Sequence, residues 1–329
     1  MKNKKVLMIE NLKTNLINQS LIQSKSIHLI KRYSRKLKKK KSKNKKHYNF
    51  FQLAIACLLL IFIIISFLIL YNKYLNIYND YYLYIFITAH KDFPNKLTNS
   101  SYYQIICDHK TQLKNKYQLK IIEAFENNEL FKKKRGYCEG SKIYYIWKKY
   151  KNGEISSKYI GFIHYRRIFT FRDNIPDLDK IFSHYDAIIN SKIKFKTNIK
   201  TQFAEGHLGK FMDDIEDIIK ENFTQYYSSA IKSLNNNIFT CCNIFIMKKK
   251  DFIKYGEFVF GVLFEFDRRH QLNNDNDIKN LIASEILKSG KRTSLEYQTR
   301  QEAFLMERIS IIFYDYYFKN VLEIGITSQ

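Results

Sequence analysis

Residues 164–167, His-Tyr-Arg-Arg, form the most chemically distinctive cluster in the sequence. His164 is the last residue of the apolar run KYIGFIH at 158–164, and the other three residues follow that run. An arginine guanidinium is always charged, and its planar fork can donate two hydrogen bonds to one phosphate. Arg166 and Arg167, with His164 and Tyr165 beside them, would therefore suit a diphosphate that carries a base or a sugar. The same spacing also fits one structural arginine that pairs with a buried carboxylate and one solvated arginine.

Two glutamates could act as an acid or a base. Glu139 opens an expected helix, where the helix dipole favours a carboxylate. It could bind sugar hydroxyls, pair with an arginine, or only cap the helix. Glu307 follows Phe304 by three residues in an expected C-terminal helix, and so lies near its core face. A carboxylate in that position must be paired or must face a cleft.

Metal-binding patterns are weak in this chain. Asp-x-Asp occurs at 177–179 and at 275–277, but neither copy follows a strand end. His207 with Asp213 or Asp214 is more typical of a solvated surface than of a metal site. We therefore expect no metal site, and the sequence leaves a need for Mn²⁺ open. It contains no P-loop and no Gly-rich dinucleotide turn.

Short apolar runs alternate with helical periodicity from Tyr82 onward, which predicts an α/β fold with a mostly parallel sheet flanked by helices. Ligands of such sheets bind outside the carboxyl ends of the strands. The side chains that follow the first and third strands, His90 to Asp92 and His164 to Arg167, should therefore line one cleft. Strands are expected at 82–89, 103–107, 158–164, 186–190 and 239–247. Helices are expected at 117–127, 137–150, 177–184, 210–222, 225–234, 249–270 and 300–318, with a loop at 273–277.

The run Leu53–Tyr71 carries no charge and is long enough to cross a hydrocarbon core of about 30 Å. Lysine and arginine crowd residues 31–46 before it, so the positive-inside rule places the N-terminus in the cytosol. We expect a basic tail at 1–50, a signal-anchor helix at 51–71, a stem at 72–81, a domain at 82–320 and a tail at 321–329. The domain would be lumenal, in the Golgi or ER, or extracellular. The sequons at Asn99 and Asn222 would lie on that side.

The net charge of +25 does not by itself indicate nucleic-acid binding. Residues 1–50 carry 16 of the Lys and Arg residues and one Glu, which accounts for +15 of the total. The remainder is spread over the domain as a solvated surface, so we expect a membrane but no nucleic acid as partner. Four of the cysteines, Cys107, Cys138, Cys241 and Cys242, fall in the expected lumenal part. They allow three disulfide pairings, or they remain as free thiols.

Five segments resemble the domain-of-unknown-function 4422 family over about residues 83–320: ITAHKDFP at 87–94, YCEGSKIYYIWKKY at 137–150, YIGFIHYRRIF at 159–169, CNIFIMKK at 242–249 and FLMERI at 304–309. Proteins of this family are glycosyltransferase-like and are common in capsular and surface polysaccharide gene clusters. The resemblance implies a GT-A-like α/β fold, a nucleotide-sugar donor, and sugar transfer to a glycan acceptor.

The matched segments contain the residues that we expect to form the site. We expect donor binding by His90, Asp92, Tyr137, Tyr165, Arg166, Arg167 and Asn243, and catalysis by Glu139, Glu307 and His164. The basic segment Phe131–Arg135 departs from the family pattern, which is acidic there. This departure and the lack of a convincing Asp-x-Asp motivate an alternative, a catalytically inactive lectin-like lumenal protein of the same fold. A structural anchor that tethers partners through its tail is a third hypothesis.

Overall fold

The computed structural model describes residues 31, 55–67, 81–94, 97, 101–114, 118–125 and 128–328. The chain divides into two compact units, residues 1–75 and 76–329. In the first unit, residues 55–67 are helical and their apolar side chains are mostly exposed. The rest of the expected anchor and stem, the basic tail apart from Lys31, and the sequon at Asn99 lie outside the described residues. Among the helices that are described, none has both the length and the apolar character that a membrane span requires.

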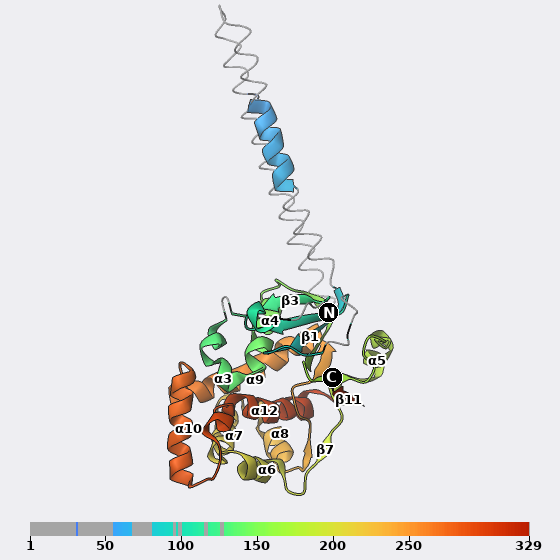
Figure 1. Cartoon of the computed structure of the whole chain (residues 1–329). Coiled ribbons are helices and arrows are strands. Elements are labelled where there is room, and N and C mark those ends of the chain that lie inside the picture. Colours follow the sequence, from blue (N-terminus) through green and yellow to red (C-terminus); the bar gives the residue numbers. More distant parts are fainter. Residues whose placement is uncertain are drawn as a thin grey trace, which may run out of the picture. The chain divides into compact units, whose positions relative to one another are not determined.

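The second unit is built on a mixed, mostly parallel sheet (Figure 1). The strands run in the order β10-β6-β9-β4-β1-β2-β3, and β5 joins β4 to β11 at one side. Strand β9 is antiparallel to its neighbours β4 and β6, while β1 is parallel to β2 and β4. The bounds are Tyr81–Thr88 (β1), Tyr103–Cys107 (β2), Lys120–Glu123 (β3), Ser157–His164 (β4), Arg167–Phe169 (β5), Ala187–Asn190 (β6), Phe245–Lys248 (β9), Val321–Ile324 (β10) and Ile326–Ser328 (β11). The expected α/β architecture is confirmed.

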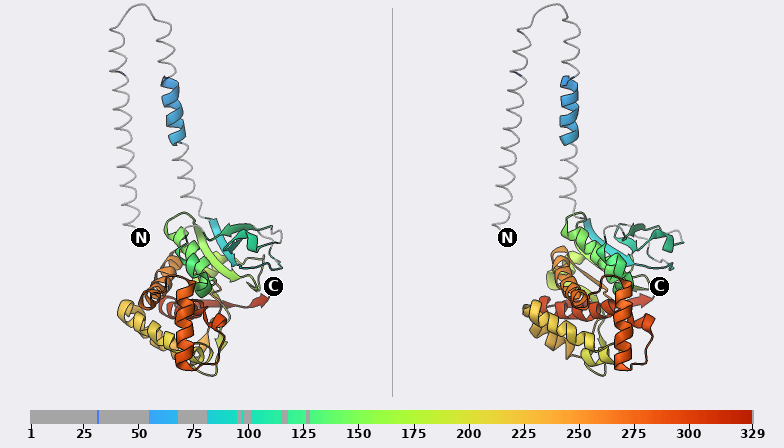
Figure 2. Two further views of the ribbon diagram at one scale, coloured as in Figure 1. Left: turned by 60° about the vertical axis from the view of Figure 1, so that its left-hand side comes forward. Right: turned by 90° about the vertical axis from the view of Figure 1, so that its left-hand side faces the viewer.

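Both faces of this sheet are buried, because successive side chains of a strand point to opposite faces. In β1, Tyr84 and Phe86 join one apolar core, and Leu83, Ile85 and Ile87 join another. The first core is shared with α4 (Gly140–Lys151), α7 (Lys210–Asn222), α8 (Thr224–Leu234), α9 (Lys249–His270) and α12 (Gln301–Tyr317). The second is covered by α5 (Leu178–His184), by β5 and by Phe93 and Leu97. Figure 2 shows α9 and α12 with the other long helices beside the sheet.

Most expected elements are present, and three expectations were wrong. Residues 120–123 form β3 beside β2 rather than part of a helix, because the short apolar pair Ile121 and Ile122 fits either period and strand pairing decides. The expected strand 239–247 is divided by a turn. Its first part is β8 (Ile238–Phe239), which pairs with β7 (Ile193–Lys194) in a separate sheet, and its second part is β9. The expected tail 321–329 supplies β10 and β11.

One expected helix is divided, and the helix that begins at Asp275 was not expected at all. The expected helix 137–150 is split into α3 (Lys134–Tyr137) and α4, because Cys138 has φ of +49° and ends the first of them. The expected loop at 273–277 contains the start of α10 (Asp275–Ser289), where Asn274 and Asp277 form a capping box. The remaining elements are η1 (Lys110–Gln112), η2 (Glu129–Lys133), α6 (Ile199–Gly206) and α11 (Leu295–Gln298).

Candidate active site

A cavity of about 470 Å³ opens at the carboxyl ends of three neighbouring strands. Thr88 ends β1, and the strand register places it beside Ile106 of β2 and His164 of β4. The rest of the lining comes from α3, from the first turn of α4 and the residues before it, from α11, and from the residues between α11 and α12. The cavity is lined by Thr88, Ala89, His90, Lys91, Asp108, Lys134, Arg135, Cys138, Glu139, Lys142, His164, Tyr165, Arg166, Glu296, Thr299 and Arg300. Side chains that follow β1 and β4 thus line one cavity, as the strand-end argument expects for His90, His164 and Arg166.

The cavity wall carries more positive than negative charge. Six lysines and arginines and three carboxylates line it. Lys142 Nζ and Asp108 Oδ1 lie 2.8 Å apart, and both side chains are buried, so this pair neutralises itself. Five cations and two carboxylates then remain, which makes the cavity electrostatically suited to an anion.

Arg166 and Arg300 face this cavity without a carboxylate partner among the described residues. The Arg166 guanidinium lies over the Tyr165 ring, 5.2 Å from its centroid. Arg300 lies 5.3 Å from the Phe304 ring centroid, and its Nε donates to Cys138 Sγ at 3.3 Å. Aromatic contacts orient both guanidinium groups without neutralising their charge. Both guanidinium groups therefore remain available to bind a phosphate. For Arg166 this agrees with the diphosphate-binding interpretation of the His-Tyr-Arg-Arg cluster.

The two cavity histidines are neutral near neutral pH. Burial, and then the charge of Arg166, lowers the pKa of His164 to about 3. His164 Nδ1 accepts a hydrogen bond from the Arg166 backbone N–H at 3.3 Å, which leaves Nε2 as the protonated nitrogen. Burial, followed by Lys142 and Lys91, also lowers the pKa of His90. These rings can exchange hydrogen bonds with a ligand, and the positive charge comes from lysine and arginine.

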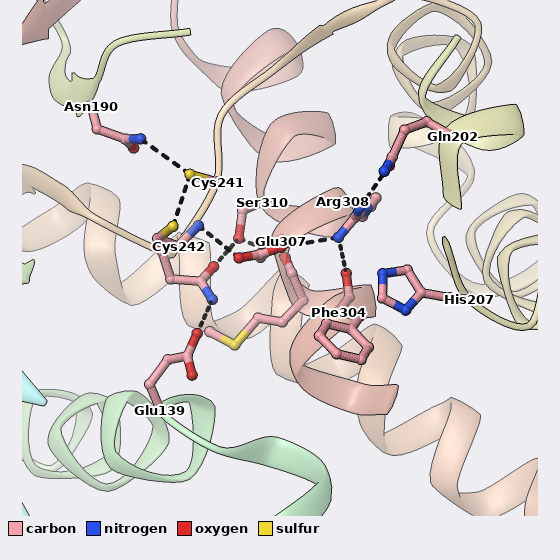
Figure 3. A network of polar contacts seen from close by, with 12 residues as sticks. Glu139, Asn190, Gln202, His207, Cys241, Cys242, Phe304, Glu307, Arg308 and Ser310 are labelled. Atoms are coloured by element: carbon pink, nitrogen blue, oxygen red, sulfur yellow. Dashed lines mark hydrogen bonds and ion pairs between the residues drawn. The ribbon is translucent and has the colours of Figure 1, made fainter. Parts of the chain in front are cut away.

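Glu139 is the carboxyl group best placed to act on a bound molecule (Figure 3). Its Oε1 accepts a hydrogen bond from Asn243 Nδ2 at 3.3 Å, and Asn243 Oδ1 accepts one from Ser310 Oγ at 3.2 Å. Burial, and then the nearby Glu307, raises the pKa of Glu139. Asn243 thus holds one oxygen of the Glu139 carboxyl group. This carboxyl group lies in a cationic cavity, and its pKa is raised.

Glu307, the second glutamate with an expected catalytic role, does not line this cavity. Its Oε1 accepts from the Cys242 backbone N–H at 2.7 Å, and its Oε2 accepts from Arg308 Nη1 at 2.9 Å (Figure 3). Arg308 is itself buried and also donates to Gln202 Oε1 at 2.9 Å. Glu307 therefore holds the turn before β9 and compensates a buried arginine.

Four of the expected donor-binding residues also lie outside the cavity lining, and Asn243, one of them, contacts Glu139 as described above. Arg167 begins β5, directly after the turn that holds Tyr165 and Arg166, and donates to Cys242 Sγ. Tyr137 is fully buried, and its hydroxyl donates to Asp267 Oδ2 at 2.7 Å. Asp92 accepts hydrogen bonds from the Lys114 backbone N–H at 2.7 and 2.9 Å. His90, Glu139, His164, Tyr165 and Arg166 are brought together, and Asn243 supports Glu139.

Sequence reasoning missed several cavity residues. Lys142 lies three positions after Glu139, so helical spacing could have placed both on one face of α4. Asp108 follows β2 directly, as His90 follows β1 closely, and could have been found by the same strand-end argument. Lys134 and Arg135 belong to the basic segment that departs from the family pattern, and they add to the cationic wall.

The Asp-x-Asp pairs serve the helix ends and the surface. The Asp177 carboxylate accepts from the Lys180 backbone N–H at 3.1 Å and caps α5. Asp179 Oδ1 receives Lys158 Nζ and the Tyr159 hydroxyl, each at 2.6 Å. Asp277 belongs to the capping box of α10. These contacts account for three of the four aspartates.

The model of a domain of unknown function, DUF4422, matches residues 84–317, which covers the segments that carried the resemblance. Among solved structures, the chain is similar to "WbbM bifunctional glycosytransferase apo structure", with a TM-score of 0.55 and 17% sequence identity. That likeness covers 75% of this chain and 45% of the other, so this chain spans less than half the length of that protein. It shows a shared fold. No curated protein matches the chain. Because the family model spans most of the sequence, the chain belongs to the DUF4422 family.

Proposed function

We propose that this protein is a glycosyltransferase that moves a sugar from a nucleotide-sugar donor to a glycan acceptor. The observation that carries the proposal is the cationic cavity at the ends of β1, β2 and β4, which also contains the carboxyl group of Glu139. Ligands of α/β sheets bind at this edge. The likeness of the fold to a bifunctional glycosyltransferase supports the same class of reaction.

The donor's diphosphate would be held by the guanidinium groups of Arg166 and Arg300, with Lys91 beside them. Negative charge grows on the diphosphate as it leaves, and preorganised cations in a partly closed cavity stabilise that charge. The neutral rings of His90 and His164 would supply hydrogen bonds to the sugar or the base.

The transfer step uses one proton acceptor. The acceptor's hydroxyl oxygen forms the new bond to the anomeric carbon, and the bond from that carbon to the phosphate oxygen breaks with its electron pair going to the diphosphate. The hydroxyl proton goes to the Glu139 oxygen that Asn243 does not hold. A carboxylate with a raised pKa is the better base for such a step.

The apolar stretch 51–71 is proposed as a single membrane anchor, with residues 1–50 in the cytosol and the α/β unit on the other side. The sequence supports this, through the uncharged run and the basic residues before it. Asn222 is exposed at the end of α7 and offers a test. Expression in a secretory-pathway host should give a band that glycosidase shifts, and Asn222→Gln should reduce that shift. An unglycosylated protein with Asn222 intact would contradict the topology.

Donor binding is tested by titrating the full chain, in detergent, with a panel of sugar nucleotides and nucleoside diphosphates. Loss of a charge-assisted contact costs about 1.5–3 kcal/mol, so Arg166→Ala should weaken binding by about 10- to 150-fold. Arg167→Ala should have a much smaller effect, because Arg167 lies outside the cavity lining. Lys180→Ala, on the exposed surface of α5, controls for the loss of one positive charge. Equal losses in Arg166→Ala and Lys180→Ala would contradict the assigned site.

Turnover is tested with the best-bound sugar nucleotide and a panel of glycan acceptors. Glu139→Gln should lower kcat by at least two orders of magnitude and leave donor affinity nearly unchanged, because it removes a base and keeps the cations. Glycan binding without any nucleotide binding would favour the lectin-like alternative. Retained turnover in Glu139→Gln would exclude Glu139 as the base.

A further inference from the structure

Cys241 and Cys242 form a pair of adjacent free thiols in the turn between β8 and β9 (Figure 3). Their Sγ atoms lie 2.8 Å apart, and both residues are half-buried. The turn is unusual, because Cys242 and Asn243 have φ of +74° and +48°. Residues other than glycine rarely adopt this left-handed conformation, and it tends to occur at functional turns. Neither thiol lines the cavity described above.

The surroundings of the pair favour a reactive thiol. The Arg167 guanidinium contacts Cys242 Sγ, and Asn190 Nδ2 approaches Cys241 Sγ at 3.7 Å. The hydrogen bond from Cys242 lowers the pKa of Cys241 to about 7, and the same interaction raises the pKa of Cys242. Glu307 opposes ionisation of both thiols and Arg167 favours it. The hydrogen bond that Cys242 donates thus stabilises the thiolate of Cys241, and the thiolate is the reactive form of cysteine.

We propose that Cys241 and Cys242 are a redox-active dithiol that closes to a disulfide between adjacent residues by exchange with a small-molecule disulfide of the glutathione type. In the first step Cys241 Sγ attacks one sulfur of that disulfide, a mixed disulfide forms, and one thiolate leaves. In the second step Cys242 loses its proton and its Sγ attacks Cys241 Sγ, which expels the second thiolate. Two protein thiols are oxidised, and one small-molecule disulfide is reduced to two thiols.

Such a bond would be easily reduced. Consecutive Cα atoms are 3.80 Å apart, whereas the Cα atoms of an ordinary disulfide are usually 4.4–6.8 Å apart. The departure stores strain, and strained disulfides are the labile and regulatory ones rather than the structural ones. The pair is therefore a reversible modification site, and only one of the three pairings that four cysteines allow contains the bond between Cys241 and Cys242.

The turn connects this pair to the cavity. An effect of oxidation on turnover through this connection rests on the proposed function. The ring that closes on oxidation includes the backbone nitrogen of Cys242, which donates to Glu307 at 2.7 Å. The next residue, Asn243, donates to Glu139. Oxidation thus acts on the segment that positions the proposed base, so turnover should respond more than donor affinity.

The modification is tested on the reduced full chain, in detergent, with oxidised glutathione as probe. Mass spectrometry of the proteolytic peptide that contains both residues should show the loss of two hydrogen atoms and no retained glutathione. Cys241→Ser and Cys242→Ser cannot close the ring. Cys242→Ser should retain glutathione on Cys241, and Cys138→Ser should react as the unaltered protein does. A stable glutathione adduct on the unaltered protein, no reaction, or a link from either residue to Cys138 would overturn the proposal.

A second measurement tests whether formation of the disulfide affects the proposed active site. Turnover and donor affinity are compared for the reduced protein, the oxidised protein and the oxidised protein after mild reduction. A several-fold change in kcat that reduction reverses supports the coupling, and unchanged turnover after complete ring closure excludes it. If the protein proves to have no transferase activity, the mass measurement still decides whether the disulfide forms.

Discussion

Replacement of Lys142 by methionine should destabilise the α/β unit strongly, because it leaves the Asp108 carboxylate buried without its partner. Lys142 Nζ and Asp108 Oδ1 are 2.8 Å apart, and the two side chains are only 5% and 8% exposed. Removal of one partner from a buried ion pair costs about 3–5 kcal/mol. For a unit of this size, that loss should lower the melting temperature by roughly 6–20 °C.

The assay is thermal unfolding of the full chain, followed by near-ultraviolet circular dichroism. The double variant Lys142→Met with Asp108→Asn removes both charges and should recover at least half of the loss. Lys151 and Glu257 provide a control, since they are paired at 3.4 Å but are 48% and 49% exposed. Lys151→Met should change the melting temperature little. If Lys142→Met behaves like Lys151→Met, or if the double variant loses the sum of the two single losses, the reasoning about this buried pair is wrong.

Two further predictions concern packing and pH. A Cβ atom on Gly256 would lie 2.1–2.5 Å from the Trp147 indole, so Gly256→Ala should lower stability by about 1–3 kcal/mol or more in urea unfolding. Gly206→Ala, whose added Cβ would lie 4.0 Å from Gln202 Nε2, should be neutral or slightly stabilising, and an equal loss at both positions would contradict the packing argument. Burial lowers the pKa of His164 to about 3 and that of His207 to about 4, from 6.5. The unfolded chain therefore binds protons below about pH 6.5 that the folded chain does not, so the free energy of unfolding should fall from pH 6.5 towards pH 4 and be independent of these groups above pH 7. His207→Gln should make that fall smaller, and an identical pH dependence in the variant would refute the assignment.

The fold could be predicted where a local pattern was long or buried on both faces. The expected helices 210–222 and 249–270 coincide with α7 and α9, since an amphipathic period repeated over many residues has one stable solution. Strand 103–107 coincides with β2 because all of its residues are apolar or buried on both faces of the sheet. Short runs failed. Residues 120–123 are too few to distinguish the two periods, and their pairing with β2 made them a strand.

The candidate site divides in the same way. The strand-end argument placed His90, His164 and Arg166 in one cavity, because the ends of parallel strands meet at one edge. It could not separate Arg166 from Arg167, since the start of β5 decides which of them faces the cavity.

The α/β class, the edge of the sheet that carries the cavity and the membership of the DUF4422 family could all be read from the sequence, because each depends on patterns local to short segments. Which carboxylate is available to a ligand depends on packing between distant segments. Glu139 faces the cavity, whereas Glu307 is hydrogen-bonded at both oxygens, because the fold brings the distant Cys242 backbone to Glu307 and buries the adjacent Arg308. The partner of a buried polar group is set by packing, and no local pattern encodes it.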